Sequence, residues 1–341
     1  MGCIYKELDP SDIKMEIVSF YNNSKKENIY GLINIGFTCY MNSFLQLLFH
    51  CPKFINELKK VLVKDKEITN NLIKIIENPK SKNNLIKFKF SLKNISVDYS
   101  KYIQNDSQKF GMDLLNEIIN EIKDENSYYI TTESQDETNS NSKINPEKEY
   151  KYFIDKYQNN LIPIEEMFLI NEYKISKRKF ENEKIMFEKN LDIKLHFPKT
   201  SSSNYSFSLK ELLDFKYHNM NFSNNIKICK FPDILIITII RAELREKFKR
   251  YKVNYPDILQ LKDYADTNIT RFEESEYILL GVNKKIGYSS KYGHYYCEIK
   301  IGKIWYKFDD YNVTKDIPFS NCSNEVVGLF YIKKSLINFI Y

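Results

Sequence analysis

The sequence predicts an α+β fold, with helices in the first third of the chain and a sheet in the last third. In the first third, apolar residues recur at the spacing of amphipathic helices. In the last third, short segments rich in β-branched and aromatic residues often alternate with polar residues, which is typical of strands. We expect a mainly antiparallel sheet there, and a cleft where the helices meet it.

The expected elements follow one another simply along the chain. Asp9-Pro10-Ser11 predicts a helix start before residues 13–20. Helical spacing predicts further helices at residues 44–50, 54–77 and 107–123. Residues 125–149 lose this periodicity and are rich in Ser, Asn, Thr and Glu, so we expect a flexible surface insertion. Strands are predicted at residues 191–196, 234–240, 277–282, 295–301, 304–308 and 326–332.

Composition excludes several classes of protein. With 43% hydrophobic, 28% charged and 15% aromatic residues, the chain of 341 residues is not a disordered, collagenous or coiled-coil protein. Its length fits one large domain or two ordinary ones. The formal net charge of +6 is spread along the chain without blocks of like charge, so we expect no nucleic-acid partner.

The apolar runs are too short for a membrane span. The longest run with strand character, residues 234–240, is far below the roughly 20 residues that a transmembrane helix needs. The first residues also lack the apolar stretch of a signal peptide. We therefore expect no transmembrane segment and a cytoplasmic or nuclear location.

The first three residues carry one signal for weak membrane anchoring. Met1-Gly2-Cys3 is compatible with acylation of Gly2 and Cys3, and two chains suffice for stable anchoring. Position 6 is Lys6 instead of the preferred Ser or Thr, which favours the alternative of an ordinary trimmed N-terminus.

The cysteines and histidines indicate thiol chemistry without a metal. No Cys-x-x-Cys pair occurs, and the histidines do not show the spacing of a zinc site. In a chain with no export signal, the cysteines are expected to be free thiols. We predict no metal and no cofactor. The cysteines lie at positions 3, 39, 51, 229, 297 and 322.

Cys39 is the first candidate for a catalytic residue. It lies in a loop that leads directly into the apolar helix, so its thiol meets the positive end of a helix dipole and the unpaired N–H groups there. Both features favour the thiolate that a nucleophile requires. The alternative is a buried structural cysteine, which position alone favours.

His294 and Asp309 supply the partners that a cysteine nucleophile needs. His294 begins one predicted strand, and Asp309 ends the next, after a short turn at Gly302-Lys303. Residues near the open ends of such a hairpin are neighbours, so the carboxylate can orient the imidazole as a general base. For His294 alone, a structural histidine would be the better interpretation, but for the combination it is not.

These residues carry a family resemblance. The segment GLINIGFTCYMNSFLQLLF resembles the Cys box of the ubiquitin-specific proteases, and GHYYCEIK with WYKFDD resembles their His box. Between the two, QNDSQKF is similar to the Gln/Asp box of the family. The resemblance covers about residues 29–335, in the same order along the chain.

The resemblance implies specific roles near the nucleophile. Cys39 would be the nucleophile, His294 the general base and then acid, and Asp309 the orienting group. Asn34 would stabilise the oxyanion together with the backbone N–H of Cys39. Asp310 is a further candidate for assisting this polarisation, with a turn-capping role as the even alternative.

The resemblance also implies ubiquitin and ubiquitinated proteins as partners. The ubiquitin tail ends in Arg-Gly-Gly, so a narrow channel with acceptor groups is expected. Gln104 and Asp106 match the family residues that line this channel, and Gly293 and Tyr295 match its far wall. Asp106 could also cap the helix that follows, and the two roles are compatible.

Fold and domain boundaries follow from the same resemblance. It implies a papain-like cysteine protease fold with a helical thumb, a β-sheet palm and reduced fingers without zinc, since only Cys229 lies near the place of the usual Cys pairs. The catalytic domain would span residues 29–335, with an extension at 1–28 and a tail at 336–341. Phe37 replaces the Asn that is common two residues before the nucleophile, and we interpret this as a packing change.

The implied function is a deubiquitinating cysteine protease. It would hydrolyse the isopeptide or peptide bond after the C-terminal Gly of ubiquitin through a thioester acyl-enzyme. One alternative is a non-catalytic ubiquitin-binding scaffold, and another is an isopeptidase for a ubiquitin-like modifier.

Overall fold

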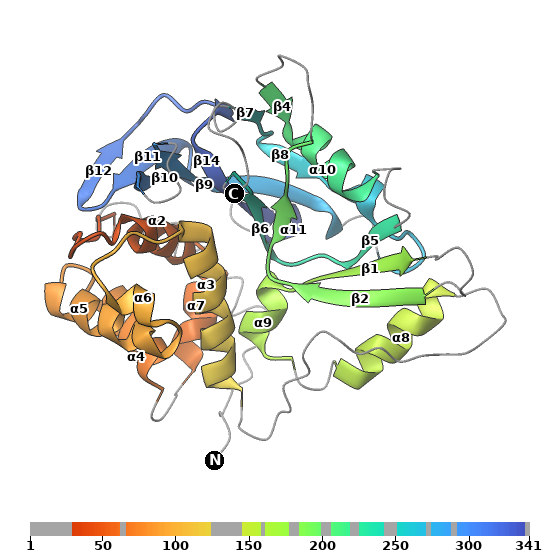
Figure 1. Cartoon of the computed structure of the whole chain (residues 1–341), viewed down its shortest axis with the longest axis horizontal. Coiled ribbons are helices and arrows are strands. Elements are labelled where there is room, and N and C mark those ends of the chain that lie inside the picture. Colours follow the sequence, from red (N-terminus) through yellow and green to blue (C-terminus); the bar gives the residue numbers. More distant parts are fainter. Residues whose placement is uncertain are drawn as a thin grey trace.

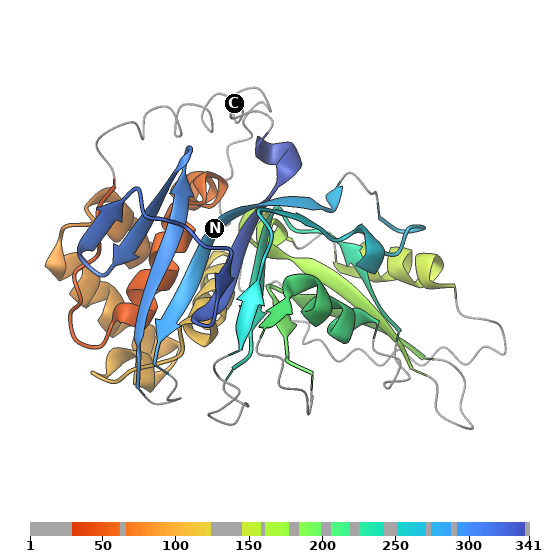
Figure 2. The same ribbon diagram turned by 90° about the horizontal axis from the view of Figure 1, so that it is seen from above.

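The computed structural model confirms the α+β prediction, with helices packed beside a large sheet (Figures 1 and 2). The structure describes residues 29–61, 66–123, 145–157, 161–176, 184–198, 206–218, 225–241, 251–270, 274–287 and 292–337. The expected extension at 1–28, with its helix at 13–20 and the Gly2/Cys3 signal, lies outside these residues.

The first part of the chain forms a helical bundle, which we call the thumb. Its helices are α2 (Cys39–Phe49), α3 (Pro52–Lys60), α4 (Glu67–Glu77), α5 (Lys82–Ser91), α6 (Val97–Ser100) and α7 (Ser107–Ile122). The other helices are α8 (Pro146–Tyr157), α9 (Pro163–Phe168), α10 (Leu209–Tyr217) and α11 (Lys334–Ile337). None of the described helices is long and apolar enough to cross a bilayer.

The second part is built on an eight-stranded sheet, which we call the palm. Its strand order is β12-β11-β10-β9-β14-β6-β3, with β8 also paired to β9. The bounds are β3 (Ile193–Leu195), β6 (Ile234–Ile239), β8 (Ile258–Gln260), β9 (Glu276–Ile286), β10 (His294–Ile301), β11 (Ile304–Asp309), β12 (Asn312–Lys315) and β14 (Val326–Lys333). Pairing is antiparallel except between β3 and β6, which are parallel, so the sheet is mainly antiparallel as expected.

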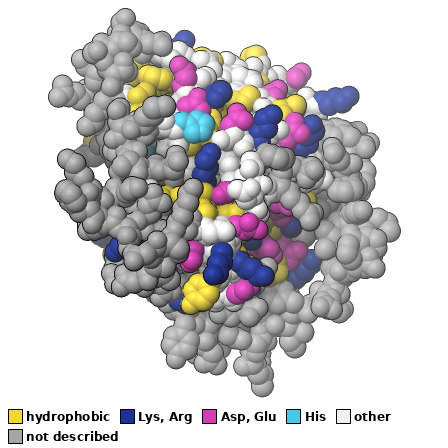
Figure 3. Space-filling view, turned by 90° about the vertical axis from the view of Figure 1, so that its right-hand side faces the viewer, with side chains coloured by type: hydrophobic (Ala, Val, Ile, Leu, Met, Phe, Trp, Pro, Cys, Tyr) yellow, Lys and Arg dark blue, Asp and Glu magenta, His cyan; other side chains and the backbone are white. Residues whose placement is uncertain are grey.

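Two smaller sheets complete the fold. One has the order β2-β1-β5, with β1 (Ile170–Ser176), β2 (Lys184–Asn190) and β5 (Asn225–Lys230), and extends away from the thumb (Figure 1). The other has the order β13-β7-β4, with β13 (Cys322–Ser323), β7 (Lys252–Asn254) and β4 (Ser206–Ser208). Basic and acidic side chains are interspersed on the face that Figure 3 shows.

Helix α2 lies at the centre of the molecule, between α7 and the palm. Nearly all its side chains are buried, and the Phe44 ring packs edge-on against both Phe110 of α7 and Phe330 of β14. A Cβ at Gly111 would lie 2.0 Å from the Phe44 ring, so only glycine lets the two helices approach this closely. The start of α2 is therefore fixed relative to the strands.

Three of the predicted segments are wrong in their extent. The expected helix at 54–77 is two helices, because α3 ends at Lys60 and α4 begins at Glu67. The Glu121 carboxylate of α7 accepts the N–H groups of Ile68 and Thr69 at 3.0 and 2.7 Å, and so stabilises a helix start that local sequence does not indicate.

The expected insertion at 125–149 is also too long. Its last residues form the first turn of α8, where the Asn145 side chain accepts the N–H of Glu147 at 3.0 Å as a helix cap. Residues 125–144 lie outside the described part of the chain. The expected tail at 336–341 likewise begins inside α11.

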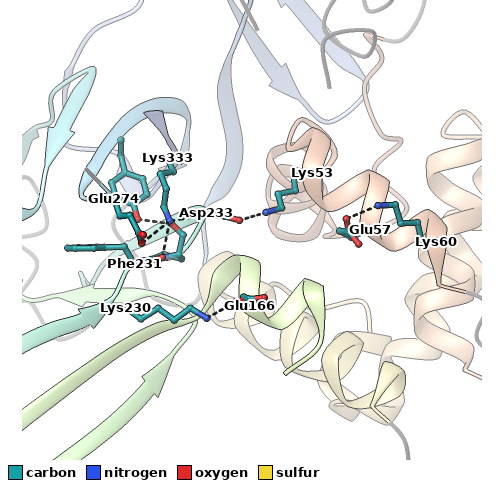
Figure 4. A network of polar contacts seen from close by, with 11 residues as sticks. Lys53, Glu57, Lys60, Glu166, Lys230, Phe231, Asp233, Glu274 and Lys333 are labelled. Carbon is teal, nitrogen blue, oxygen red and sulfur yellow. Dashed lines mark hydrogen bonds and ion pairs between the residues drawn. The ribbon is translucent and has the colours of Figure 1, made fainter. Parts of the chain in front are cut away.

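Asp233 connects the thumb to the palm (Figure 4). At the start of β6, its carboxylate forms ion pairs with Lys53 of α3 and with Lys333 of β14, the latter at 3.3 Å. Burial raises the pKa of Asp233, but the two ammonium groups lower it more, so the pKa lies below its usual value. The carboxylate therefore stays ionised at neutral pH.

We expect Asp233→Asn to lower the free energy of unfolding by about 2 kcal/mol, because charged hydrogen bonds to two lysines are lost. Chemical denaturation at pH 7 measures the change, with Asp98→Asn at an exposed ion pair as the control. Since the folded-state pKa is lowered, this stability is present above the unfolded pKa near 3.8 and is lost as the pH falls through the folded-state value. An equal loss in both variants would contradict the prediction.

Candidate active site

Cys39 is the first residue of α2, and its side chain is 3% exposed. The preceding residue, Thr38, caps the helix without a side-chain hydrogen bond to the first turn, and that turn contains no acidic residue. The N–H groups at this helix end thus act on Cys39 without a competing negative charge nearby in α2. This is the position that the sequence predicted for the thiol.

His294 lies between Cys39 and Asp309. Its Nε2 is 2.6 Å from Oδ1 of Asp309, which leaves Nδ1 to interact with Cys39. The interaction with Cys39 is the largest of the effects that raise the pKa of His294 to about 9, and the hydrogen bond to Asp309 also raises it. Desolvation acts in the opposite direction and lowers the pKa. The imidazole is therefore protonated at neutral pH.

Asp309 is held as a carboxylate by two cationic partners. Burial raises the pKa of Asp309, but hydrogen bonds from Lys307 and His294 lower it by a larger amount, so the pKa lies below its usual value. The pairing of β10 with β11 sets Cys297 opposite Phe308, which brings Asp309 diagonally across from His294. The hairpin geometry expected from the sequence is thus present.

Asn34 presents an amide N–H beside the nucleophile. Its Oδ1 accepts the N–H groups of Gly36 and Thr38 at 3.0 and 3.2 Å, so the other end of the amide must be the donor. Nδ2 donates one hydrogen to Asp310 at 2.9 Å. Among the described residues, no acceptor takes its second hydrogen, which can therefore meet a developing oxyanion.

Asp310 connects the Asn34 loop to α2. Its Oδ2 accepts from Asn34, and its Oδ1 accepts from Nδ2 of Asn42 at 2.8 Å. Its backbone oxygen accepts the N–H of Leu32 at 3.0 Å, and a Cβ at Gly31 would lie 2.3 Å from that oxygen. Asp310 thus orients Asn34, beyond the turn-capping role that was its alternative.

Asn42 is a residue that the sequence reasoning missed. Its side chain is 1% exposed and donates to the Leu32 carbonyl at 3.2 Å as well as to Asp310. It therefore holds the nucleophile helix, the loop before it and the turn after β11 in one arrangement. A polar residue on an otherwise apolar buried helix was the available signal.

The four residues expected to line a channel come together in two pairs. Gln104 forms two hydrogen bonds with the backbone of Gly293, at 2.7 and 2.8 Å. Asp106 caps α7 by accepting two backbone N–H groups, and its Oδ2 accepts from the Tyr295 hydroxyl at 3.3 Å. Tyr295 is buried, and its contact with Asp106 is made through the hydroxyl.

Phe37 does not make the packing change that we expected. Its ring is 52% exposed, and its backbone φ is 55°, in the left-handed region. Asn is tolerated in this conformation better than other residues with a side chain, which explains why Asn is common there. Phe37 thus combines a left-handed backbone with an exposed ring two residues before Cys39.

One group of described residues has metal-ligand chemistry. His294, Asp309 and Asp310 offer ligand atoms within 4.8 Å of one another. All four carboxylate oxygens, however, already accept hydrogen bonds or ion pairs from side chains of the protein. The donors fit a thiol–imidazole–carboxylate site better than a cation site.

Comparisons with known proteins identify the family to which this chain is similar. The family model described as "Ubiquitin carboxyl-terminal hydrolase" matches residues 30–331. "Ubiquitin carboxyl-terminal hydrolase 4" from Arabidopsis thaliana is 27% identical over 319 residues, covering 84% of this chain and 85% of that protein. "Ubiquitin carboxyl-terminal hydrolase 12" from Salmo salar is 25% identical over 311 residues, covering 85% of this chain and 82% of that protein.

The fold is shared with solved structures. The Ubp8/Sgf11/Sus1/Sgf73 module of SAGA bound to monoubiquitin matches with a TM-score of 0.65 and 20% identity, over 96% of this chain and 76% of that chain. The same module bound to ubiquitin aldehyde matches with a TM-score of 0.64 and 21% identity, over 96% of this chain and 76% of that chain.

We expect kcat/KM for a ubiquitin C-terminal amide to decline as the pH rises above about 9, because His294 then loses its proton. Asp309→Asn removes a negative charge and an acceptor, lowers the pKa of His294 and moves this decline to lower pH by about one unit. Initial rates between pH 6 and 10 test this. Asp155→Asn, in α8, is the control. A decline at the same pH in wild type, Asp309→Asn and Asp155→Asn would contradict the prediction.

We expect Asn34→Ala to lower kcat by about 10²- to 10³-fold with little change in KM, because its second N–H acts only on the oxyanion of the transition state. Steady-state kinetics measure both constants. Asn116→Ala, on the exposed face of α7, should leave them unchanged. A rise in KM with an unchanged kcat would instead indicate a role in ground-state binding.

Proposed function

Since this chain belongs to the ubiquitin carboxyl-terminal hydrolase family, we propose that Cys39 hydrolyses the bond after the C-terminal glycine of ubiquitin. The family makes the chain a thiol-dependent deubiquitinating hydrolase. The single observation that carries the assignment to residues is the arrangement of Cys39, His294 and Asp309, in which the imidazole hydrogen-bonds Asp309 and interacts with Cys39.

The first half of the proposed reaction forms an acyl-enzyme. The Cys39 thiolate attacks the glycine carbonyl carbon, and the negative charge moves to the carbonyl oxygen. That oxygen is stabilised by Nδ2 of Asn34 and the backbone N–H of Cys39. The C–N bond then breaks, and the amine of the acceptor lysine leaves with the proton from His294, which leaves a thioester on Cys39 and a neutral imidazole.

The second half releases ubiquitin. The neutral His294 takes a proton from water, and the resulting hydroxide attacks the thioester carbon. When the C–S bond breaks, the ubiquitin tail leaves as a carboxylic acid that loses its proton to water or to the released amine, and Cys39 returns as the thiolate beside a protonated imidazole. Asp309 keeps the imidazole oriented through both steps.

The proposed partners are ubiquitin and proteins that carry it. Gln104, Asp106, Gly293 and Tyr295 would line the channel for the tail, with the Asp106 carboxylate available to an arginine of that tail. Oδ1 of Asp106 accepts the two backbone N–H groups of α7. Oδ2, which contacts the Tyr295 hydroxyl, is therefore the oxygen that would accept from the arginine.

The proposed location is the cytoplasm or nucleus. Support comes from the cysteines, since the five in the described part of the chain are all free thiols. Free thiols are typical of reducing compartments, where a cysteine nucleophile stays active.

Experiment can distinguish two alternative functions from the proposed one. A non-catalytic ubiquitin-binding scaffold would not need the assembled triad, and a mismatched or absent partner for Cys39 would have favoured it. An isopeptidase for a ubiquitin-like modifier would use the same chemistry with different surface contacts.

The test is labelling by ubiquitin that carries a C-terminal electrophile, under reducing conditions. We expect wild type and Cys322→Ser to form a covalent adduct, because Cys322 lies outside the site, and Cys39→Ser to form none while still binding ubiquitin. Mass spectrometry identifies the adduct. An unreactive wild type would reject the proposal, and labelling only by a ubiquitin-like modifier would support the second alternative.

A further inference from the structure

We infer that Lys307 is a positioning residue for the reaction, because it holds one oxygen of the Asp309 carboxylate so that the other faces His294. This inference rests on the proposed function and deepens it. It assigns a role to a cation that touches neither the nucleophile nor the predicted substrate channel.

The Asp309 carboxylate lies between two cationic groups. Nζ of Lys307 is 2.9 Å from Oδ2, and Nε2 of His294 is 2.6 Å from Oδ1. A carboxylate with only one partner can rotate and present either oxygen. With Lys307 on one oxygen, the plane of the carboxylate and the direction of its second oxygen are both fixed.

Lys307 is itself held from its other side. Its Nζ lies 4.4 Å from the centre of the Tyr296 ring, and the Tyr296 hydroxyl donates to Glu325 at 2.5 Å. The Glu325 backbone oxygen accepts the N–H of Lys285 in β9 at 2.8 Å. The ring is therefore anchored, through Glu325, to the neighbouring strand β9, and it provides a fixed surface for the lysine ammonium.

The register of the palm explains this grouping. Glu298 of β10 pairs with Lys307 of β11, so the next pair on the same face is Tyr296 with Asp309. Side chains two residues apart point to the same face, which puts Lys307 and Asp309 on the face that carries His294 and Tyr296.

Stability does not explain why this ion pair is held so firmly. The side chains of Lys307 and Asp309 are 31% and 30% exposed, and ion pairs this open to water contribute little to folding. Their effect on the imidazole is larger. Without Lys307, the full charge of Asp309 would act on His294, which would hold its proton more tightly, whereas the reaction requires that proton to reach the leaving amine.

Other charged groups around His294 do not replace Lys307. Lys284 and Glu298 form a buried ion pair with each other at 2.6 Å, and Asp310 is engaged by two amides. The titratable groups that face this region from neighbouring elements are Cys39 of α2, Asp106 at the start of α7, Lys284 and Lys285 of β9, Tyr295, Tyr296 and Glu298 of β10, Asp310 after β11, and Glu325 before β14.

The first readout needs no ubiquitin. Iodoacetate alkylates the Cys39 thiolate, and its negative charge makes the rate depend on a protonated His294 beside the thiolate. We expect Lys307→Met to move the alkaline decline of this rate to higher pH by about half a unit to one unit, opposite to Asp309→Asn. Mass spectrometry of the Cys39 peptide measures the rate between pH 6 and 10.

The second readout is turnover of a ubiquitin C-terminal amide. We expect Lys307→Met to lower kcat about 5- to 20-fold at pH 7.5 with KM within two-fold, because the orientation of His294 is less well defined. Lys307→Arg keeps the charge, the contact with the Tyr296 ring and the hydrogen bond, so it should restore both the pH profile and most of kcat.

Lys315→Met is the matched control, since it removes an equal charge from the exposed strand β12 without a contact to Asp309. An unmoved decline in Lys307→Met, or an equal shift in Lys315→Met, would overturn the inference. A wild type that shows the expected alkylation profile but does not cleave ubiquitin would reject the proposed function, while the shift in Lys307→Met would still decide the role of Lys307.

Discussion

The burial of α2 between α7 and the palm is the constraint on which the rest of the structure depends. Phe44 of this helix occupies space that any side chain at Gly111 would fill, and Leu47 lies against Gly281 of β9 in the same way. The helix therefore cannot slide or rotate without clashes on both sides. Since Cys39 is its first residue, the packing of apolar side chains determines where the thiol meets the imidazole.

A second set of contacts connects the packed core to the polar groups of the active site. Asn42 donates from the buried face of α2 to the Leu32 carbonyl and to Asp310, and Asp310 in turn accepts from Asn34. Gly31 lets the loop approach the backbone of Asp310. The oxyanion donor, the nucleophile and the end of β11 are thus oriented together before any substrate binds, which is the preorganisation that transition-state stabilisation requires.

Much of this arrangement could be predicted because it rests on local patterns. A loop followed by an apolar helix placed Cys39, and a two-strand hairpin with a short turn placed His294 near Asp309. The parts that could not be predicted depend on contacts between distant segments. Glu121 caps α4 across the thumb, Asn42 reaches a turn 268 residues away, and Lys307 owes its position to Tyr296 on the next strand. The interpretation of Phe37 as a packing change is wrong because the sequence shows the side chain but not the left-handed conformation of its backbone.

The folded protein, without substrate, holds His294 protonated between Cys39 and Asp309. The most direct measurement is an NMR titration of the His294 imidazole, assigned with His294→Gln among the four histidines of the chain. We expect the ring to stay protonated at pH 7.5 and to lose its proton near the pKa of about 9. A ring that titrates near the ordinary value of about 6.5 would contradict the account.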